Sequence, residues 1–300
     1  TFADRITVIR GGKVVGTTTP AEADQNQLAS MMVGRDVLLE VDKKPAEVRD
    51  VVLKAEDLII FDDLNNPAVK GISFEVRGGE ILGIAGVQGN GQTELVKAIT
   101  GLSHPSSGTL TLLDQDITKA SPRTITELGS AHIPEDRQHD GLVLTSTIMD
   151  NMVLNTYYLA PYAKGVIIQE DKVLENAEKI IENFDVRTPS PLIPVGSLSG
   201  GNQQKVIVGR EFSRPIKFLV AAQPTRGLDV GSIEYIHSRL LEKRADGVAI
   251  LLVSTELDEI MELSDRIAVM FAGEIIAVVD AEGVTKEQIG LLMAGVKEME

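Results

Sequence analysis

Apolar and polar residues alternate along the early part of the chain in three short runs, at residues 51–58, 72–76 and 109–113. An alternation with a period of two is typical of strands that bury one face and expose the other. These runs therefore predict half-buried antiparallel strands at the start of a folded domain.

A helical period replaces this alternation between about residues 140 and 190. The apolar residues that recur there at a spacing of 3.6 are Val173, Leu174, Ala177, Ile180, Ile181 and Phe184. The last part of the chain returns to wholly apolar runs at 218–222 and 249–253, separated by a helical segment. This order predicts an α/β fold with an antiparallel β subdomain, a parallel-sheet core and a helical subdomain at about 138–195.

An internal repeat changes the expected domain organisation. The segment ADRITVIRGGKVVGT at 3–17 matches SDRIAVMFAGEIIAV at 264–278, and the register continues without insertion to Gly34 and Gly295. Self-similarity of this kind indicates tandem homologous units, so we expect the chain to belong to a longer protein. The expected parts are the tail of a preceding domain at 1–35, a linker at 36–47 and a second domain at 48–300.

Composition narrows the possible functions. The chain has 300 residues, of which 43% are hydrophobic, so it can bury one large core or two smaller ones. Its net charge of −15 argues against a nucleic-acid-binding surface, which needs clustered Lys and Arg. No apolar stretch approaches the roughly 20 residues that span a bilayer, and the absence of cysteine excludes disulfides and thiolate metal sites. Four histidines without metal-ligand spacing are predicted to be ordinary surface or core residues: His104, His132, His139 and His237.

Residues 86–93 read GVQGNGQT and follow the phosphate-loop pattern G-x-x-x-x-G-K-[ST], with Gln92 in the place of the lysine. In such a loop the glycines let backbone N–H groups point at phosphate oxygens, the lysine neutralises the outer phosphates and the Ser or Thr hydroxyl holds Mg²⁺. An apolar run precedes the loop and helical spacing follows it, as a phosphate site at a helix start requires. A glycine-rich turn without a ligand is the alternative. The predicted nucleotide-binding residues of the loop are Gly86, Gly89, Asn90, Gly91, Gln92 and Thr93.

A second pattern, LSGGNQQKV at 198–206, puts a serine and two glycines ahead of a helix that we expect to begin near Gln203. A helix start with small residues can approach an anion closely and offer it backbone N–H groups. The segment closely resembles the signature of the ATP-binding cassette (ABC) ATPases, so the chain is identified as a P-loop NTPase of ABC type. The resemblance implies that the signature serves the nucleotide of a partner domain through Leu198, Ser199, Gly200, Gly201, Asn202 and Gln203.

The resemblance also implies where the family's catalytic residues should lie. PTRGLD at 224–229 is similar to the segment that leads into the D-loop, with Asp229 in that loop. Family members normally carry an aspartate that orients Mg²⁺ and a glutamate that acts on the attacking water at the preceding strand end, and a switch histidine after a later strand. This chain has Ala222, Gln223 and Thr255 at these positions, so no catalytic residue is expected to be retained.

Three further expectations concern the surroundings of this site. Glu135, in HIPEDR, stands where the resemblance implies the Q-loop glutamine of the nucleotide site. Phe61 is the candidate for an aromatic residue that stacks on adenine, with simple burial in the core as the alternative. Thr255 is expected to open a helix through a Thr-x-x-Asp capping pattern with Asp258.

The combination of PEDR, LSGGNQQK and AAQPTRGLD is most similar to the ATPase subunits of bacterial importers for sugars and nucleosides, and the last segment is nearer to the nucleoside branch. The resemblance implies ATP as the nucleotide and Mg²⁺ on the hydroxyl of Thr93, with metal retention weakened by the missing aspartate. The implied partners are a first ABC domain of the same chain, a transmembrane permease and, indirectly, a solute-binding protein, with no nucleic acid. The implied location is peripheral, on the cytoplasmic face of the cell membrane.

All the replaced residues belong to the half of the domain that would bind and hydrolyse its own nucleotide, whereas the signature is intact. We therefore predict an asymmetric role, in which the domain's own site binds ATP weakly and the signature completes the site of the first domain. A structural or regulatory docking domain that binds no nucleotide is the alternative. An ABC protein acting on ribosomes or DNA is disfavoured by the acidic charge.

Three of the four tyrosines cluster at Tyr157, Tyr158 and Tyr162, near the region where the family contacts its permease. Aromatic anchors are typical of interfaces. Tyrosines that pack within their own subdomain are the more ordinary explanation.

Overall fold

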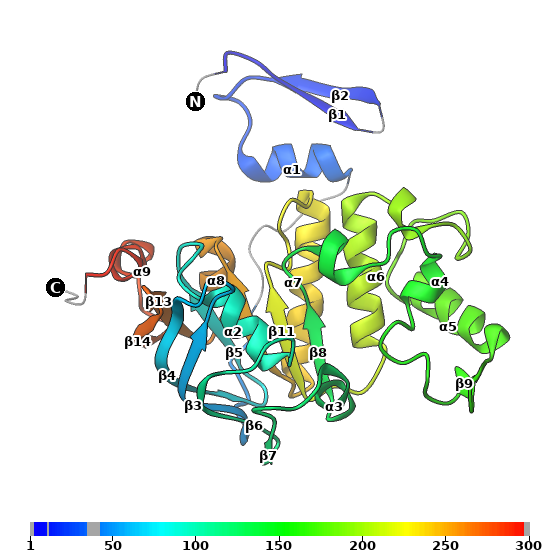
Figure 1. The fold of residues 1–300 in the computed structure, drawn as a ribbon. Coiled ribbons are helices and arrows are strands. Elements are labelled where there is room, and N and C mark those ends of the chain that lie inside the picture. The colour runs from blue at the N-terminus through cyan, green and yellow to red at the C-terminus, as the bar shows by residue number, and fades with distance from the viewer. Residues whose placement is uncertain (1–2, 11, 35–42, 297–300) are drawn as a thin grey trace.

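A six-stranded sheet runs through the centre of the molecule in the computed structural model, which describes residues 3–10, 12–34 and 43–296 (Figure 1). Its strands, in order across the sheet, are β14 (Glu274–Asp280), β13 (Arg266–Phe271), β5 (Ile81–Ala85), β12 (Ala249–Ser254), β11 (Phe218–Ala222) and β8 (Ser130–Ile133). β14 runs antiparallel to β13, and the other neighbouring pairs are parallel. β5, β11 and β12 are buried along their whole length, as the apolar runs of the sequence predict.

A smaller antiparallel sheet covers part of one face of the central sheet (Figure 1). Its strands, in order, are β4 (Pro67–Arg77), β3 (Val51–Phe61), β6 (Ser107–Leu112) and β7 (Gln115–Asp116). The antiparallel subdomain predicted from the alternating runs is thus confirmed. Helix α2 (Gln92–Ile99) packs into the same hydrophobic core, and α3 (Pro122–Glu127) follows after β7.

The opposite face of the central sheet is covered by helices. They are α6 (Gly200–Phe212), α7 (Val230–Ala245), α8 (Leu257–Leu263) and α9 (Lys286–Met293). Side chains alternate between the two faces along each strand, so Leu219 and Ala221 face these helices while Val220 and Ala222 face the core of α2. The parallel strands therefore end at one edge of the sheet, where the loops after β5, β8, β11 and β12 meet.

The segment predicted to be helical at about 140–190 is only partly so. It contains a single π-helical turn (Arg137–Gly141), α4 (Ile148–Asn151), a small hairpin of β9 (Ala163–Lys164) and β10 (Ile167–Ile168), and α5 (Glu170–Asn183). The helical period is correct for α5, which buries Val173, Ala177 and Ile180. Turns replace helix before it, where Pro161 lacks a backbone N–H and Gly165 takes a positive φ of 64°.

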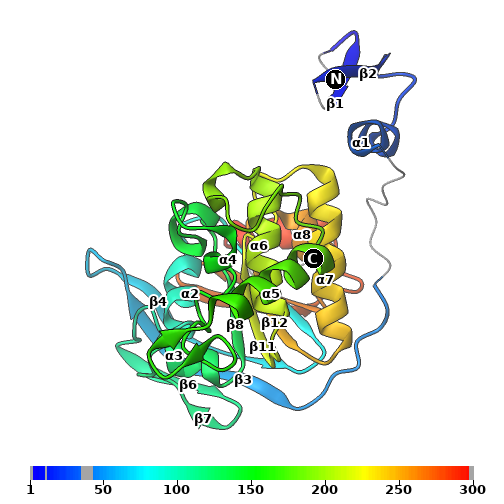
Figure 2. The same cartoon turned by 90° about the vertical axis from the view of Figure 1, so that its right-hand side faces the viewer.

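The N-terminal repeat folds like its C-terminal counterpart. β1 (Ile6–Arg10), β2 (Lys13–Thr18) and α1 (Gln25–Val33) match β13, β14 and α9 in order, and the two hairpins share a register shift after Val8 and after Val269. Gly34 and Gly295 have φ values of 90° and 87°. The repeat stands apart from the central sheet, with α1 nearest to α7 (Figure 2).

The hairpin of the repeat differs from its counterpart in what covers it. Met270 on β13 is fully buried, whereas Ile9, at the matching position on β1, is 64% exposed. β13 pairs with β5 on the side away from β14, while β1 and β2 form a sheet of two strands. The hairpin therefore presents apolar surface that its counterpart buries inside a domain.

An ion pair fastens α7 to the start of β13. Arg244 donates from Nε and a terminal guanidinium nitrogen to the two carboxylate oxygens of Asp265, at 2.8 and 2.6 Å, and Asp265 also accepts from the backbone N–H of Ile81 at 2.8 Å. The Arg244 side chain is 5% exposed. Removal of one partner would leave a buried charge uncompensated.

We expect Asp265→Ala to lower the free energy of unfolding by about 3 kcal/mol, because it strands the guanidinium of Arg244. Urea titration followed by circular dichroism measures the loss. Asp258→Ala is the matched control, since Asp258 pairs with Lys286 at the surface and should change stability by less than about 1 kcal/mol. Equal effects of the two substitutions would contradict the prediction.

Candidate functional site

The phosphate loop lies between β5 and α2, as the sequence predicts. Gly89 and Gly91 have φ values of 92° and 100°, which favour glycine, and Gly91 caps α2. A Cβ on Gly91 would lie 2.3 Å from the carbonyl oxygen of Ala68. The side chain of Asn90 ties the loop to the β13–β14 turn, because it donates to Met270 O at 3.3 Å and accepts from Ala272 N at 3.0 Å. The loop therefore keeps the backbone conformation of a phosphate-binding loop and is held in it by the two hydrogen bonds of Asn90.

Gln92 folds back into this loop. Its Nε2 donates to the carbonyl oxygen of Val87 at 3.1 Å, and its Oε1 accepts the backbone N–H of Asn90 at 3.1 Å. The side chain is buried, and its Nε2 would lie 2.5 Å from a Cβ on Gly86. A lysine would direct a cation at the ligand, whereas this amide occupies the loop and satisfies one of its N–H donors.

Thr93 lies at the end of a small polar network. Its hydroxyl donates to Oε2 of Glu135 at 3.3 Å, and Oε1 of Glu135 pairs with the guanidinium of Arg226 at 3.0 Å. Arg137 in turn donates to the backbone oxygen of Arg226 at 2.8 Å. The hydroxyl expected to hold Mg²⁺ thus faces a protein carboxylate whose counter-ion is an arginine.

The ends of β11 and β12 carry the other replaced residues. Ala222 ends β11, and Gln223 follows with a positive φ of 49°. The hydroxyl of Thr255 donates to Oε1 of Gln223 at 3.2 Å. The prediction that Thr255 caps a helix is wrong: α8 begins at Leu257 with Glu256 in the capping position, and Thr255 bonds across the strand ends instead.

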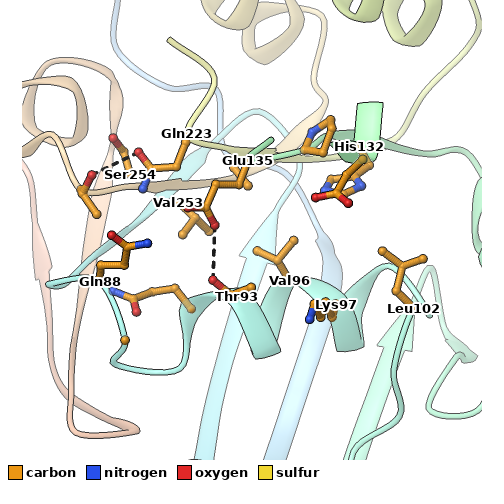
Figure 3. Close-up of a pocket in the computed structure, with 16 residues that line it drawn as sticks. Gln88, Thr93, Val96, Lys97, Leu102, His132, Glu135, Gln223, Val253 and Ser254 are labelled. Carbon is orange, nitrogen blue, oxygen red and sulfur yellow. Dashed lines mark hydrogen bonds between the residues drawn. The ribbon is translucent and has the colours of Figure 1, made fainter. Parts of the chain in front are cut away.

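A cavity of about 110 Å³ joins these groups between α2 and the ends of the central strands (Figure 3). At one end it is lined by the loop residues Gln88, Gly89, Gln92 and Thr93 and by Gln223, Thr255 and Glu135. At the other end it extends along α2 to Leu102 and His132. Leu102 lies beyond the end of α2 and is 61% exposed.

His132 lies inside the protein, in agreement with the prediction that the histidines are surface or core residues. Burial lowers its pKa to about 4, so its imidazole is neutral at pH 7. Its Nε2 is covered and has no hydrogen-bond partner among the described residues. No pattern in the sequence distinguished it from the exposed His104 or His139. Arg226 was also missed as a site residue, although it lies inside the quoted PTRGLD segment.

The signature segment lies at the start of α6, where Ser199 is exposed and Gln203 is buried. The helix begins at Gly200 with Ser199 as its N-cap, three residues earlier than the expected start near Gln203, because both glycines adopt helical geometry. Asn202 donates to the hydroxyl of Ser199 at 3.0 Å. The first N–H groups of a helix have no partners within it, so they are available to an anion beside Ser199.

Asp229, the residue predicted to belong to the D-loop, lies beside the signature. It caps α7 by accepting from the backbone N–H of Ser232 at 3.1 Å and from its hydroxyl at 2.8 Å. A Cβ on Gly201 would lie 2.4 Å from that hydroxyl and 3.3 Å from Asp229. Only glycine therefore allows this close approach of α6 to α7 without displacement.

A second cavity, of about 310 Å³, opens at this place. It is lined from α6 and α7 by Ser199, Gly201, Asp229 and Ser232, among other residues, and from the N-terminal repeat by Arg10 and Met32. The two cavities have different linings, so the signature and the phosphate loop belong to separate sites.

The aromatic residues singled out in the sequence differ in their exposure and in their contacts. Phe61 is 43% exposed at the end of β3, so its burial in the core is wrong, while its contact with adenine stays a prediction. Tyr162 donates to Asn176 at 2.9 Å, in agreement with packing inside the subdomain, whereas Tyr158 donates at 2.8 Å to Glu127 of α3, outside the predicted subdomain. Tyr157 packs edge-on against Tyr158 and is largely exposed.

The residues present do not fit a magnesium ion. Ala222 offers no ligand, and the hydroxyl of Thr93 donates to Glu135. Within the described ranges, no group of three or more acidic or histidine side chains could hold a metal. Among those same residues, no helix has the length and apolar character needed to cross a bilayer.

A glycine-rich loop between a buried parallel strand and a helix, at the carboxyl edge of a sheet, defines a P-loop nucleotide-binding domain. Residues 69–226 match the model of the ABC transporter family. The chain belongs to this family, for which ATP, typically with Mg²⁺, is the nucleotide.

Curated relatives of the chain include import proteins. The nucleoside import ATP-binding protein NupA of Lactococcus lactis subsp. cremoris (strain MG1363) is 50% identical over 98% of this chain. The guanosine import ATP-binding protein NupO of Bacillus subtilis (strain 168) is 48% identical over 100% of it, and the glucose import ATP-binding protein TsgD13 of Haloferax volcanii 42% over 97%. The chain spans 58%, 59% and 54% of these relatives' own lengths.

Solved structures agree with the fold. A nucleotide-free ATP-binding cassette from an ABC transporter superposes with a TM-score of 0.68 at 26% identity, covering 84% of this chain and all of the other. A dimeric bacterial ABC transporter cassette gives a TM-score of 0.65 at 19% identity, covering 77% of this chain and all of the other, which is a likeness of fold. The predicted ABC-type α/β fold is therefore confirmed.

We expect His132 to make stability depend on pH. Between pH 6.5 and 4 the unfolded chain protonates this histidine while the folded protein does not. The free energy of unfolding should therefore decrease as the pH is lowered through this window, by up to about 3 kcal/mol. Urea titrations at pH 7 and pH 4.5 measure the fall. His132→Phe removes the titrating group, and parallel pH profiles for the two proteins would contradict the assignment.

Proposed function

We propose that this chain is an ATP-binding part of an ABC importer for sugars or nucleosides, in which its own phosphate loop holds a nucleotide at most weakly and its signature completes the ATP site of a neighbouring domain. The observation that carries the proposal is the contrast between the two cavities. The phosphate-loop cavity has uncharged residues at 92, 222, 223 and 255, where the resemblance implies the groups that hydrolyse ATP, whereas Ser199 of the signature is exposed at a helix start.

Weak binding at the domain's own site follows from Gln92. A phosphate would have to compete with Oε1 of Gln92 for the N–H of Asn90, and the neutral amide offers no charge in return. Without a carboxylate at position 222 or 223, no group there can orient a metal or activate water. The site therefore supports retention of a nucleotide rather than turnover.

At the signature, this chain would contribute hydrogen-bond donors to a neighbour's nucleotide. Ser199 is exposed and caps the start of α6, and a negative phosphate is stabilised beside the first N–H groups of a helix. Phosphoryl transfer depends mainly on positioning and charge stabilisation, so donors supplied by another domain can affect its rate greatly. Asp229 and Ser232 hold this edge in place from α7.

The N-terminal repeat supports a tandem arrangement. Its hairpin and helix reproduce the local structure of β13, β14 and α9, and its residues Arg10 and Met32 line the signature cavity. In the complete domain, β13 lies against the phosphate loop through Met270 and Asn90. The corresponding strand of a preceding domain would therefore bring that domain's phosphate loop towards this signature.

Partners and location follow from the same proposal. A permease and, through it, a solute-binding protein would give an importer its specificity, and this chain would lie peripherally on the cytoplasmic face of the membrane. The relatives named for nucleosides favour a nucleoside over a sugar. Tyr157 is the most exposed of the three clustered tyrosines and is the side chain best suited to contact a permease.

We expect Ser199→Ala to lower ATP hydrolysis by the assembled transporter by about 100-fold, because one donor to the transferred phosphoryl group is lost. Gln92→Ala should change the same rate by less than about threefold. Phosphate release by the purified complex measures both. Ser197→Ala, two residues before the signature serine, is the matched control and should leave the rate unchanged. A larger effect of Gln92→Ala than of Ser199→Ala would overturn the division of labour.

For this chain's own site we expect weak ATP binding that changes by less than about twofold when EDTA replaces Mg²⁺, because no metal ligands are assembled. Gln92→Lys should tighten binding roughly tenfold by restoring a charge-assisted contact, without restoring turnover. Isothermal titration measures both effects. Tight, magnesium-dependent binding with measurable turnover would contradict the proposal.

Photolabelling separates the proposal from its alternative. An azido-ATP analogue should label peptides near Asn90 if the loop holds a nucleotide. Absence of labelling together with absence of a titration signal would favour a docking domain that binds no nucleotide.

A further inference from the structure

Arg137 lies against the start of the signature helix, although it belongs to the segment that carries Glu135, the residue bonded to Thr93 (Figure 3). It opens the π-helical turn that follows β8. A Cβ on Gly200 would lie 2.7 Å from Nη2 of Arg137 and 3.3 Å from its Cζ. The guanidinium therefore packs directly on the first residue of α6, and a larger residue at position 200 would have to displace it.

The same guanidinium holds the loop that leads to Asp229. Its Nη1 donates to the backbone oxygen of Arg226 at 2.8 Å, and its Nη2 lies 4.0 Å from the place of a Cβ on Gly227. Arg137 therefore bridges the first turn of α6 and the loop before α7. The second signature glycine, Gly201, packs against Asp229 in that same region, so each of the two glycines has its own neighbour.

Two glutamine side chains add to this junction. Gln138 donates from Nε2 to Oε1 of Gln203 at 3.0 Å, and Gln204 donates from Nε2 to the backbone oxygen of Pro224 at 2.7 Å. Both Gln203 and Gln204 are buried. The first two turns of α6 are therefore tied to the turn that Arg137 opens and to the loop after β11.

The Nε atom of Arg137 is covered by protein and has no hydrogen-bond partner among the described residues. A buried donor without a partner costs free energy, and such an atom in a folded protein needs an explanation. Here the arrangement leaves one donor unused while it places the guanidinium between α6 and the loop. The position of the group, rather than the number of its bonds, is what the structure maintains.

We propose that Arg137 is a positioning residue for the signature, because it fixes the first turn of α6, and with it Ser199, relative to the loop that carries Asp229. This role rests on the proposed function, since it concerns the nucleotide site of the neighbouring domain. Arg137 is not among the residues that line the signature cavity, so it acts through the position of α6 rather than by contact with the nucleotide. A misplacement of about 1 Å can cost roughly 100-fold in rate.

We expect Arg137→Met to lower kcat for ATP hydrolysis by the assembled transporter roughly tenfold and to change KM for ATP by less than about twofold, because an interaction of the transition state is lost. Arg137→Lys keeps one donor for the oxygen of Arg226 but not the planar group, so kcat should fall only about twofold to threefold. Phosphate release at a series of ATP concentrations measures both constants. Arg77→Ala, at an exposed arginine of β4, is the matched control and should change neither.

Hydrogen exchange reports the position of the first turn without turnover. The amide of Gln203 donates to the carbonyl oxygen of Ser199 at 2.9 Å and closes this turn. In Arg137→Met it should exchange roughly fivefold to tenfold faster, because the turn is less firmly held. The amide of Phe184, which donates to Ile180 at the end of α5, should exchange at an unchanged rate.

Ser199→Ala separates a failure of this role from a failure of the proposed function. If it lowers the rate while Arg137→Met changes neither kcat nor the exchange of the Gln203 amide, Arg137 does not position the signature and the proposed function stands. If neither substitution lowers the rate, both are wrong. A higher KM with an unchanged kcat would also overturn the role of Arg137. If Arg137→Met is unfolded by circular dichroism, Arg137→Lys decides: the lower kcat with unchanged KM supports the role, and an unchanged kcat overturns it.

Discussion

The parallel pairing of the central strands is the constraint on which the rest of this molecule depends. Because β5, β8, β11 and β12 run in the same direction, the loops that follow them emerge at one edge of the sheet. Residues that are far apart in the chain, such as Gln92, Glu135 and Thr255, therefore line one cavity. The same pairing directs alternate side chains of β11 to opposite cores, which puts Ala222 under α2 and leaves α6 and α7 to build the signature on the other face.

The replaced residues are consistent with one another electrostatically. A family site balances a lysine against carboxylates and a metal, so the loss of the lysine alone would leave negative charges without compensation in a partly buried place. Here the cation at position 92 and the carboxylates at 222 and 223 are absent together, and neutral amides stand in two of the three places. Two carboxylates line the cavity, Glu135, which is paired with Arg226, and Asp140, and the cation of Lys97 also lines it. The cavity therefore keeps its charge balance without a nucleotide.

Much of the fold could be predicted from the sequence, because apolar periodicity and glycine chemistry are local signals. The buried runs of β5, β11 and β12, the antiparallel strands, α5 and the repeated hairpin all followed from such patterns. The errors arose where tertiary contacts decide the outcome. Thr255 bonds to Gln223 across the strand ends rather than capping α8. Arg226 carries no signal of its own until folding brings Glu135 beside it.

The hydrogen bonds that Gln92 makes within its own loop have a consequence for movement. A phosphate loop that waits for an anion can change shape when the anion arrives or leaves, whereas this loop already has an internal group on the N–H of Asn90 and a brace from Asn90 to the β13–β14 turn. Its shape is therefore set by the chain itself. In an assembly of two unequal halves, this loop would keep one conformation throughout the cycle. The rate of each cycle would then be set by the single nucleotide that the other half binds.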